Sequence, residues 1–566
     1  MVLADFDLYR SFPPVVQAMA GTAHARGTIV VDGGGDAERR IGFSLRREPS
    51  DDRFDRLTHE FVVVERSAPA VDGNFFVERV AAAPQPVAPV AKPVASDGAT
   101  RARQAFTREA YEAITKLHPG YHAVPEAVLA ALPASYPDGT PGEMTYYEPM
   151  TGYRDEIGIR AKSAQLWAIS MDPRARANMI ANARASRWFP IHVSAPAEPG
   201  QPTRPWRYPH KSITSSTTND LAVLPDTVGN PKIKVDIPHE PQFLFDFTLS
   251  MKLEGNAQDY AWGLNEMKYW VAYNYLKMVD NQRGFTKGIF HPGSGAVTPR
   301  GAAWMARSLF MLALVLPEND EWRPWVIQSI EENILFLDGV FRTGDYDLKG
   351  PRGDLFGYGS WEKGAYRNDF GFMSPHNAGY GVGTDGRTAY LGAFQSAFQA
   401  QVWLWGYRLG LPLRPEVQKT FDTFTRWVAK FPIMMFGKTD DPGSYDYRRA
   451  GPYALAVGKI GKDGQSVAFF KTPAEFFAAN SVGLPPLPAD DHSFRDGAVE
   501  AGEFGGRWVD MMVPGLTMAV EIGVPGAADG YARLKASRQF KLGGSWPFCY
   551  LPSGEYYDAP PRSVAR

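Results

Sequence analysis

The 566-residue chain is poor in several features that would tie a protein to a compartment or a chemistry. It has one cysteine, Cys549, which excludes an internal disulfide framework and any cysteine-based metal cluster. Its 60 basic residues nearly balance its 62 acidic residues, and no Lys/Arg run stands out, so nucleic acid is not an expected partner. The fold must therefore be held together by packing.

Long apolar runs are also missing from the sequence. No stretch is apolar for long enough to span a bilayer. The N-terminal MVLADFDLYRSFPP carries Asp5 and Asp7, where a secretory signal would have a basic end and an apolar run. We therefore expect a protein that is made in the cytoplasm without a signal peptide and has no membrane partner.

Aromatic side chains, in contrast, are plentiful, with 14 Trp, 25 Tyr and 34 Phe. Most of them must be core, but aromatic rings with polar edges also suit the recognition of sugars. The length of the chain exceeds what one small domain needs, so we expect two domains.

The first 84 positions hold short β-branched and aromatic runs separated by turn residues. The runs are GTIVV, IGFSLRRE, HEFVVVERS and NFFVERV. They predict a small antiparallel β domain over residues 1–84. The Pro/Ala-rich segment 85–98 that follows favours extended polyproline geometry and is predicted to be a semi-rigid spacer.

Helical periodicity dominates the sequence from residue 99 to residue 566. Pro173 is predicted to open one helix, because proline is favoured at the first helical position. Further helices are predicted at 258–280, 299–316, 320–340, 387–409, 414–431 and 501–522. Long loops are predicted at 190–250 and 341–386. The overall fold is therefore predicted to be mainly α, an α/α toroid preceded by the small β domain. A solenoid is the competing architecture, but no fixed repeat supports it.

Two motifs resemble ligand sites but lack the neighbouring elements that such sites need. GVGTDG at 381–386 matches a dinucleotide fingerprint but lacks the preceding strand, so it is interpreted as a loop before a helix that starts near Arg387, and no cofactor is predicted. Asp236, His239 and Glu240 could supply metal ligands, but no second histidine cluster accompanies them, so no metal site is predicted.

The two loop histidines keep two interpretations each. His239 is either a hydrogen-bonded structural histidine or a proton-transfer group in a cleft. His376, in SPHNAGYGVGTDGR, has the same two interpretations.

The stretch MTYYEPMTGYRDEIG at 144–158 is too polar to be core. Asp155 is placed to cap a following helix and Glu156 to complement its positive end, which explains two carboxylates. The residues left without a structural explanation are Tyr146, Tyr147, Glu148, Tyr153 and Arg154. Tyrosines beside an arginine suit stacking on a sugar ring and pairing with an acidic substituent. Both interpretations, helix cap and binding surface, remain open.

Several segments, taken together, resemble a group of bacterial and tailed-phage or prophage proteins of the α/α six-hairpin toroid type, most of them without an assigned activity. The matching segments are EPMTGYRDEIG, MDPRARA, VDIPHEPQF, NEMKYW, TPRGAAWMARSL, FQSAFQAQVWLWGYRLGL and WVAKFP. The resemblance covers about residues 145–435 and excludes the β domain. The polar positions of the pattern correspond to Arg154, Asp155, His239, Glu266, Arg300 and Trp304. The chain departs from the pattern at Glu240, where glutamine is expected, which adds a charge beside His239.

The resemblance implies a carbohydrate ligand, since such toroids include polysaccharide lyases and glycosidases. It also implies a virion protein, a tail, fibre or surface component released by host lysis, with the β domain attaching it to other virion proteins. One alternative is a purely structural virion protein without catalysis. Another is a cytoplasmic lyase or glycoside hydrolase that acts on imported oligosaccharide.

Arg154, Tyr147, His239 and Arg300 are expected to line one cleft. In a lyase, Arg154 or Arg300 would neutralise a uronate carboxylate while His239 or Tyr147 removes the adjacent proton. The remaining predicted substrate-binding residues are Tyr153, Trp304 and His376.

In a hydrolase, the catalytic carboxylates would be Asp155 and Glu266. Glu266, within NEMKYWVAYNYL, shares its predicted helix face with aromatic residues and should be poorly solvated. Those aromatic residues are Trp262, Tyr269, Trp270 and Tyr273. Arg307 is its predicted ion-pair partner, because it aligns with Arg300 and Trp304 on one face of an otherwise apolar helix. The alternative is an unpaired Glu266 that acts as a catalytic acid.

Overall fold

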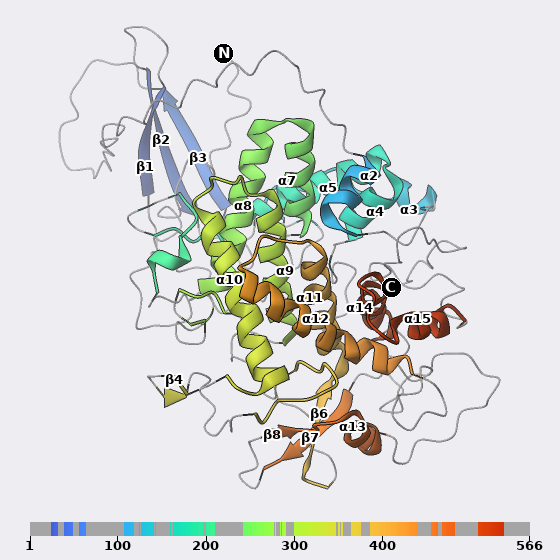
Figure 1. The fold of residues 1–566 in the computed structure, drawn as a ribbon. Coiled ribbons are helices and arrows are strands. Elements are labelled where there is room, and N and C mark those ends of the chain that lie inside the picture. The colour runs from blue at the N-terminus through green and yellow to red at the C-terminus, as the bar shows by residue number, and fades with distance from the viewer. Residues whose placement is uncertain are drawn as a thin grey trace. The chain divides into compact units, whose positions relative to one another are not determined.

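A computed structural model gives the structure of the chain (Figure 1). It divides into two compact units, Met1–Ala102 with Leu224–Asp226, and Arg103–Val223 with Thr227–Arg566. The residues that the structure describes are 24–31, 39–48, 56–63, 107–117, 124, 126–140, 142, 159, 162–188, 191–195, 198, 200–209, 242–276, 278, 283–284, 286–289, 299–346, 349–350, 353–354, 364–374, 385–437, 454–461, 467–480 and 508–536.

The first unit contains a three-stranded antiparallel sheet in the order β1-β2-β3. Its strands are β1 (His24–Val31), β2 (Arg39–Glu48) and β3 (Arg56–Val63). In the register, Ile41 of β2 lies opposite Ile29 on one side and Val63 on the other. The antiparallel sheet predicted from the first three β-rich runs is therefore confirmed. The fourth run and the spacer 85–98 lie outside the described residues.

The second unit is mostly helical, and 64% of the described residues of the chain are helical. Ten of its helices form five pairs, each joined by a short connection: α4 (Lys162–Ser170) with α5 (Pro173–Ala185), α7 (Gln242–Glu254) with α8 (Ala257–Leu276), α9 (Pro299–Val315) with α10 (Trp322–Leu337), α11 (Ala393–Arg408) with α12 (Pro415–Met435), and α14 (Trp508–Glu521) with α15 (Ala527–Ala536). The shorter helices are α2 (Arg108–Thr115), α3 (Glu126–Ala130) and α13 (Pro473–Asn480).

Small sheets accompany the helices of this unit. β6 (Thr388–Gly392), β7 (Ala454–Ile460) and β8 (Val467–Phe469) form an antiparallel sheet in that order, and β4 (Lys349–Gly350) pairs with β5 (Gly353–Asp354). A helical turn of the wider π type, Asp338–Thr343, extends α10.

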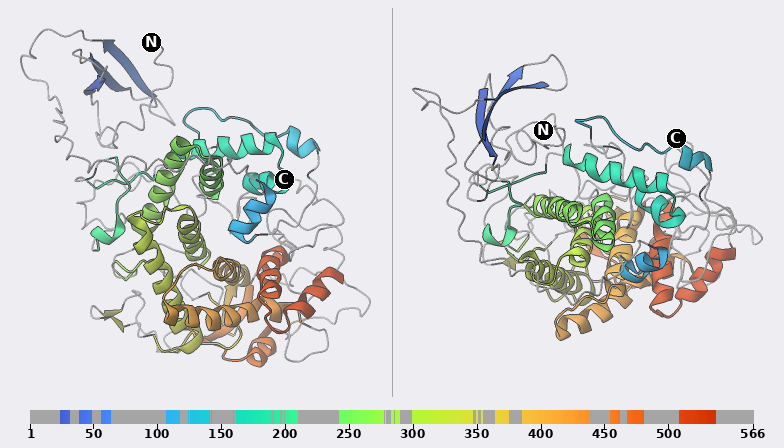
Figure 2. Two further views of the ribbon diagram at one scale, coloured as in Figure 1. Left: turned by 45° about the horizontal axis from the view of Figure 1, so that its top comes forward. Right: turned by 90° about the horizontal axis from the view of Figure 1, so that it is seen from above.

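The first helices of successive pairs contact one another, and so do several of the second helices (Figure 2). These two sets are called the two layers below. In one layer α9 contacts α7 and α11, and α11 contacts α14. In the other, α12 contacts α10 and α15. α11 is buried from Ala393 to Gly406, whereas α12 exposes a polar face that includes Lys419 and Arg426. α11 is therefore covered on all sides, whereas α12 carries part of the surface.

Long connections lead from each described helix pair of this unit to the next. The segments 186–241, 277–298, 338–392 and 436–507 connect successive pairs, whereas the connections within pairs are short. A short connection makes paired helices antiparallel. The two helices of each pair are therefore antiparallel, and a longer connection leads from each pair to the next.

The N-terminal helix α2 is tied into the core of the second unit. Trp405 of α11 donates its indole Nε1–H to the carbonyl oxygen of Thr115 at 2.7 Å, across 290 residues. Thr115 and Leu117 are fully buried. The end of α2 thus packs directly against one of the most buried helices.

Local capping explains where several helices begin. Asp172 caps α5 by accepting a hydrogen bond from the backbone N–H of Arg174 at 2.8 Å, and Pro173 takes the first helical position, as predicted. Side-chain hydrogen bonds from Arg174 lower the pKa of Asp172 to about 2.

Three predictions about secondary structure were wrong. The helix expected from Arg387 begins at Ala393, because Thr388–Gly392 pair with β7 as strand β6. The loop expected at 190–250 ends earlier, because α7 begins at Gln242. The helix expected directly after Asp155 begins at Lys162, and Ile159 lies in a bend, whereas Asp155 itself lies outside the described residues.

Candidate functional site

Most of the predicted site residues lie outside the described residues. These are Tyr147, Tyr153, Arg154, Asp155, His239 and His376, together with Asp236 and Glu240. The predicted residues that the structure does describe are Glu266, Arg300 and Trp304, with the expected partner Arg307. The predicted convergence of Arg154, Tyr147, His239 and Arg300 therefore stays a prediction.

Glu266 lies in the middle of α8 and is only 5% exposed, as its aromatic surroundings predicted. The four aromatic residues expected on its face are all buried: Trp262, Tyr269, Trp270 and Tyr273. Its partner differs from the prediction, because Glu266 Oε2 lies 2.9 Å from Nε2 of His192. The expected pairing with Arg307 is replaced by a contact with a residue on the connection between α5 and α7.

His192 is held against α8 by a short, well-bonded segment. The carbonyl oxygen of Val193 accepts hydrogen bonds from the backbone N–H of Thr203 at 3.1 Å and from its hydroxyl at 2.8 Å. The neighbours Ile191 and Val193 are fully buried. The His192 side chain is 24% exposed, compared with 7% for that of Glu266. The pair therefore has a buried acidic end and a solvent-accessible imidazole end.

Tyr269 completes this cluster from the next turn of α8. Its ring packs edge-on against the His192 ring, with centroids 4.8 Å apart and planes at 66°. Its hydroxyl lies 3.5 Å from Oγ of Ser194. Burial raises the pKa of Tyr269 to about 12, and the negative charge of Glu266 adds to this effect. The phenol therefore remains protonated at neutral pH and can act as a hydrogen-bond or proton donor.

Ion pairs fasten the segment that carries His192. Arg204 bridges Glu198, at 2.6 Å, and Glu321, at 2.5 Å, which immediately precedes α10. On α8, Lys268 pairs with Asp320 at 2.7 Å. These contacts tie the connection between α5 and α7 to the α8 and α10 region, so the position of His192 is fixed by groups outside the cluster.

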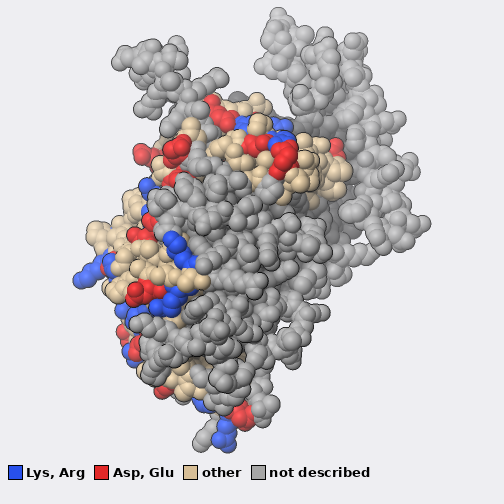
Figure 3. All heavy atoms as spheres, turned by 90° about the vertical axis from the view of Figure 1, so that its right-hand side faces the viewer, with Lys and Arg blue, Asp and Glu red and all other residues tan. Residues whose placement is uncertain are grey.

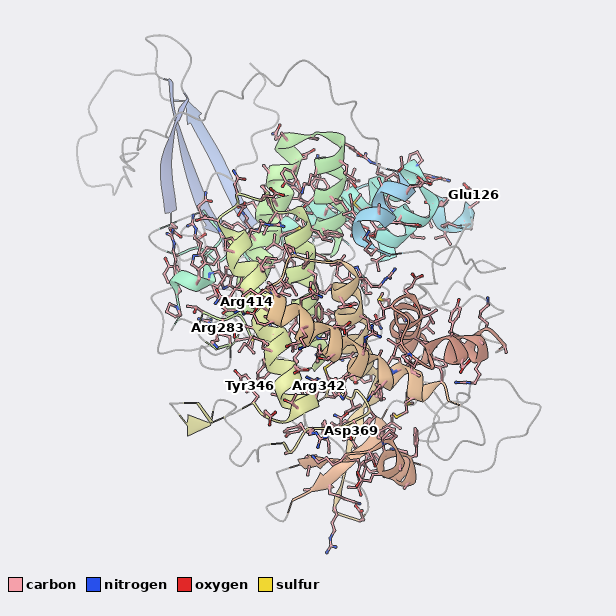
Figure 4. The ribbon with its side chains drawn as sticks, in the orientation of Figure 1. Glu126, Arg283, Arg342, Tyr346, Asp369 and Arg414 are labelled. Carbon is pink, nitrogen blue, oxygen red and sulfur yellow. The ribbon has the colours of Figure 1, made fainter. Side chains whose placement is uncertain are left out.

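The far end of the same segment is fixed by a buried arginine (Figure 4). Arg283 is fully buried and donates from Nη2 to the carbonyl oxygens of Tyr208, at 2.8 Å, and Pro209, at 3.2 Å. Its guanidinium also lies 5.0 Å from the ring centroid of Tyr275 on α8. The segment is therefore anchored at both ends relative to Glu266.

This arrangement can orient a histidine base. An ionised carboxylate only accepts hydrogen bonds, so with Glu266 ionised the proton of the neutral imidazole lies on Nε2 and Nδ1 is the basic nitrogen. A carboxylate that fixes the tautomer and orientation of a histidine is a recurrent device of proton-transfer sites. Tyr269 adds a neutral donor beside it. Glu266, His192 and Tyr269 are called the α8 cluster below.

The other described residues of the predicted site lie on α9. Arg300 is in the first turn and is half-buried. Trp304 is fully buried, and its ring packs 5.0 Å from that of Phe398 on α11. The Arg307 guanidinium is fully buried 6.0 Å from the Trp304 ring centroid. The structure thus places Trp304 in the packing between α9 and α11.

Sequence reasoning missed His192 and its place beside Glu266. The only local signal is a histidine between two apolar residues in the run IHVS, a pattern shared with ordinary half-buried strands. The pair is separated by 74 residues, so only the tertiary fold brings the two side chains together.

Charges of both signs are mixed on one face of the molecule. On the face in Figure 3, the basic and acidic side chains of the described residues alternate instead of forming a single-sign patch. Among those residues, no three His, Cys, Asp or Glu side chains gather in a way that could hold a metal ion. No helix found in the described ranges combines the length and apolarity needed to cross a membrane.

Comparison of the chain with known protein families, with curated proteins and with solved structures gives no match.

Proposed function

We propose that the chain is a carbohydrate-active protein that cleaves an acidic polysaccharide by proton abstraction, with His192 as the base. The observation that carries the proposal is the contact of Glu266 Oε2 with His192 Nε2 at 2.9 Å, buried at the carboxylate and accessible at the imidazole. A general base needs a partner that orients it and a ring that the substrate can reach, and this difference in burial provides both.

The proposed reaction is a β-elimination at a uronate residue of the polymer. His192 Nδ1 takes the proton from the carbon next to the uronate carboxylate, and the electron pair of that C–H bond forms a carbon–carbon double bond. The neighbouring C–O bond breaks, and the leaving oxygen receives a proton from Tyr269 or from water. Glu266 does not contact the substrate in this scheme, because its role is to hold His192 and stabilise the imidazolium that forms.

The carbon acid is weak unless the uronate carboxylate is neutralised. Arg300 in the first turn of α9 and Arg154 remain the proposed partners of that carboxylate. A hydrolase needs two carboxylates beside the bond. The described contact of Glu266 is with a histidine, which favours elimination over hydrolysis with Asp155.

The proposed architecture of the second unit is an α/α toroid. Its support is the series of five described helix pairs, the contacts between successive pairs, and the burial of α11 beside the partly exposed α12. Such an arrangement places loop residues of many pairs around one binding region.

The proposed biological setting is a phage or phage-like particle, in which the three-stranded sheet of the first unit attaches the protein to other virion proteins. Its support is the sequence resemblance and the separate compact unit that contains the sheet. Mass spectrometry of purified particles tests the setting, and absence of the protein from them would remove it.

The activity is tested by incubating the full chain with acidic host surface polysaccharide. The proposal expects new reducing ends together with the ultraviolet absorbance of an unsaturated uronate. Reducing ends without that absorbance would indicate a hydrolase. Retention of the polymer without any product would indicate the second candidate, a virion protein that binds polysaccharide without catalysis.

A further inference from the structure

Two buried polar atoms near the start of α11 have no hydrogen-bond partner in the described part of the chain. Gln395, in the first turn of α11, is 8% exposed, and its Oε1 is buried and unpaired. Ser374 is fully buried, and its Oγ is likewise unpaired. Since buried polar atoms are nearly always paired in native proteins, each such atom requires an explanation.

The two side chains belong to segments that touch at the first turn of α11. The backbone N–H of Met373 donates to Oγ of Ser396 at 3.0 Å, which holds the residue before Ser374 against this turn. Side chains on a helix lean toward its N-terminus, so the amide of Gln395 is carried toward the start of α11. Both unpaired groups therefore belong to one end of this helix.

The start of α11 also lacks the groups that usually satisfy a helix N-terminus. Its N-cap residue is Gly392, which provides no side-chain hydrogen bond, and the first turn contains no acidic residue. A helix N-terminus presents backbone N–H groups and a partial positive charge.

One turn further along α11, the side chain of Gln399 has a structural role. Oε1 of Gln399 accepts a hydrogen bond from the indole Nε1–H of Trp403 at 2.9 Å. Oε1 of Gln399 is thus paired within the protein, and Oε1 of Gln395 is not. This contrast separates a glutamine used for packing from one that is available to a ligand.

The chemistry of these groups selects a class of ligand. Gln395 Oε1 needs a donor, the helix start favours an acceptor, and the Ser374 hydroxyl serves as either. A carboxylate or a fully ionised phosphate cannot donate to Gln395, and the helix end disfavours an ammonium group. A neutral hydroxyl group satisfies all three requirements.

We infer that Gln395, Ser374 and the start of α11 form a binding site for the hydroxyl groups of a neutral sugar. The inference rests on the proposed polysaccharide function and adds an uncharged residue to its ligand, beside the uronate. An acidic polysaccharide that alternates charged and neutral sugars fits both parts.

The test is saturation-transfer NMR of the full chain with methyl glucoside, methyl galactoside and methyl mannoside, in wild type and in Gln395→Leu. At least one glycoside should bind to the wild type, and Gln395→Leu should weaken that binding about tenfold, the effect of one neutral hydrogen bond. The melting temperature of Gln395→Leu without ligand should stay the same or rise, because an unpaired buried group is removed.

Gln399→Leu is the matched control. It should lower the melting temperature, since it breaks the bond to Trp403, and it should leave glycoside binding intact. Failure of all three glycosides to bind the wild type would overturn the inference. So would a Gln395→Leu variant that binds normally and melts early, because its amide would then hold only an ordered water.

A separate assay distinguishes this inference from the proposed function. Glycoside binding without turnover of acidic polysaccharide would reject the elimination reaction and keep the neutral site. Turnover without glycoside binding would reject the neutral site alone.

Discussion

The carboxylates of Asp172 and Glu266 illustrate two uses of an acidic side chain in one molecule. Asp172 at the start of α5 is half-buried, and its partner Arg174 is two residues away. Glu266 in α8 is buried, and its partner His192 is 74 residues away. The first carboxylate shapes a local turn of helix, whereas the second exists as a pair only in the folded protein. A polar group whose partner is distant and partly accessible is the better indicator of function.

The comparison predicts that His192 matters more for activity than for stability. His192→Ala should reduce elimination about 10²- to 10⁴-fold, the usual contribution of a positioned general base. Its free energy of unfolding should fall by about 1 to 3 kcal/mol, as for Glu266→Gln, because the same bond is lost and the Glu266 carboxylate stays buried. Initial rates of unsaturated uronate formation and a thermal melt measure both effects.

Glu254→Gln is the control for loss of an ion pair. Glu254 at the end of α7 pairs with Arg176 at 2.6 Å and takes no part in the α8 cluster. Elimination at the wild-type rate is expected. An equal loss of activity in this variant would show that the effect of His192→Ala is not specific.

Glu266→Gln should have a smaller effect on the same reaction. The amide keeps the shape of the side chain but no longer orients His192 or stabilises its protonated form. Turnover should fall about 10- to 100-fold, as for other groups that act through a catalytic histidine. The free energy of unfolding should fall by about 1 to 3 kcal/mol, since a charge-assisted hydrogen bond is lost.

Glu266→Asp tests whether Glu266 positions His192. It restores a carboxylate one methylene shorter, and partial recovery of turnover with a shifted pH profile is expected. A Glu266→Gln variant with wild-type turnover would mean that the carboxylate only stabilises the fold.

The burial of Tyr269 should make the stability of the folded protein decrease at alkaline pH. Its pKa is raised to about 12 from an ordinary value of 10.0, so the folded state holds the phenol proton more tightly than the unfolded state. The resulting stability is fully present below pH 10 and is lost as pH rises toward 12, by roughly 2 to 3 kcal/mol.

Chemical unfolding of wild type and Tyr269→Phe between pH 9 and pH 12 isolates this effect. The phenylalanine variant should lose less stability over that range, because it lacks this titrating group, and should show a modest loss of turnover. Tyr407→Phe, which removes a hydroxyl bonded to Asp422 at 2.8 Å, is the control for deleting a tyrosine hydroxyl elsewhere. Parallel alkaline curves for wild type and Tyr269→Phe would refute the assigned environment of Tyr269.

Replacement of Asp172 should have the smallest effect on turnover and stability among these variants. Hydrogen bonds from Arg174 lower its pKa to about 2, so the stability that it contributes is present above about pH 4 and is lost as pH falls toward 2. Asp172→Asn retains a capping side chain and should leave turnover unchanged, with only a slight decrease in melting temperature at neutral pH. Thermal melts between pH 2 and pH 7 check this, and a loss of turnover would contradict the contrast with Glu266.

The elements that sequence reasoning placed correctly are those with local causes. Pro173 opens α5 as predicted, and the first three β-rich runs form the N-terminal sheet. The start of α11 was misplaced, because Thr388–Gly392 continue its apolar pattern and become a strand only by pairing with β7.

The candidate site was predicted only in part, for the same physical reason. The burial of Glu266 followed from its aromatic neighbours on one helix face. Its partner did not, because both Arg307 and His192 are remote from Glu266 in sequence and nothing local identifies His192. Gln395 and Gln399 likewise look alike in FQSAFQAQ, and only the structure shows that Trp403 pairs with one of them.

The most direct test of the Glu266–His192 pair as a proton-transfer site is the rate of unsaturated uronate formation across pH for wild type, His192→Ala and Glu254→Gln. Wild type and Glu254→Gln should share one pH–rate profile, in which the rate rises with pH as the base is deprotonated. His192→Ala should lose that rise together with at least a hundredfold of the rate. An unchanged rate and profile in His192→Ala would contradict the account.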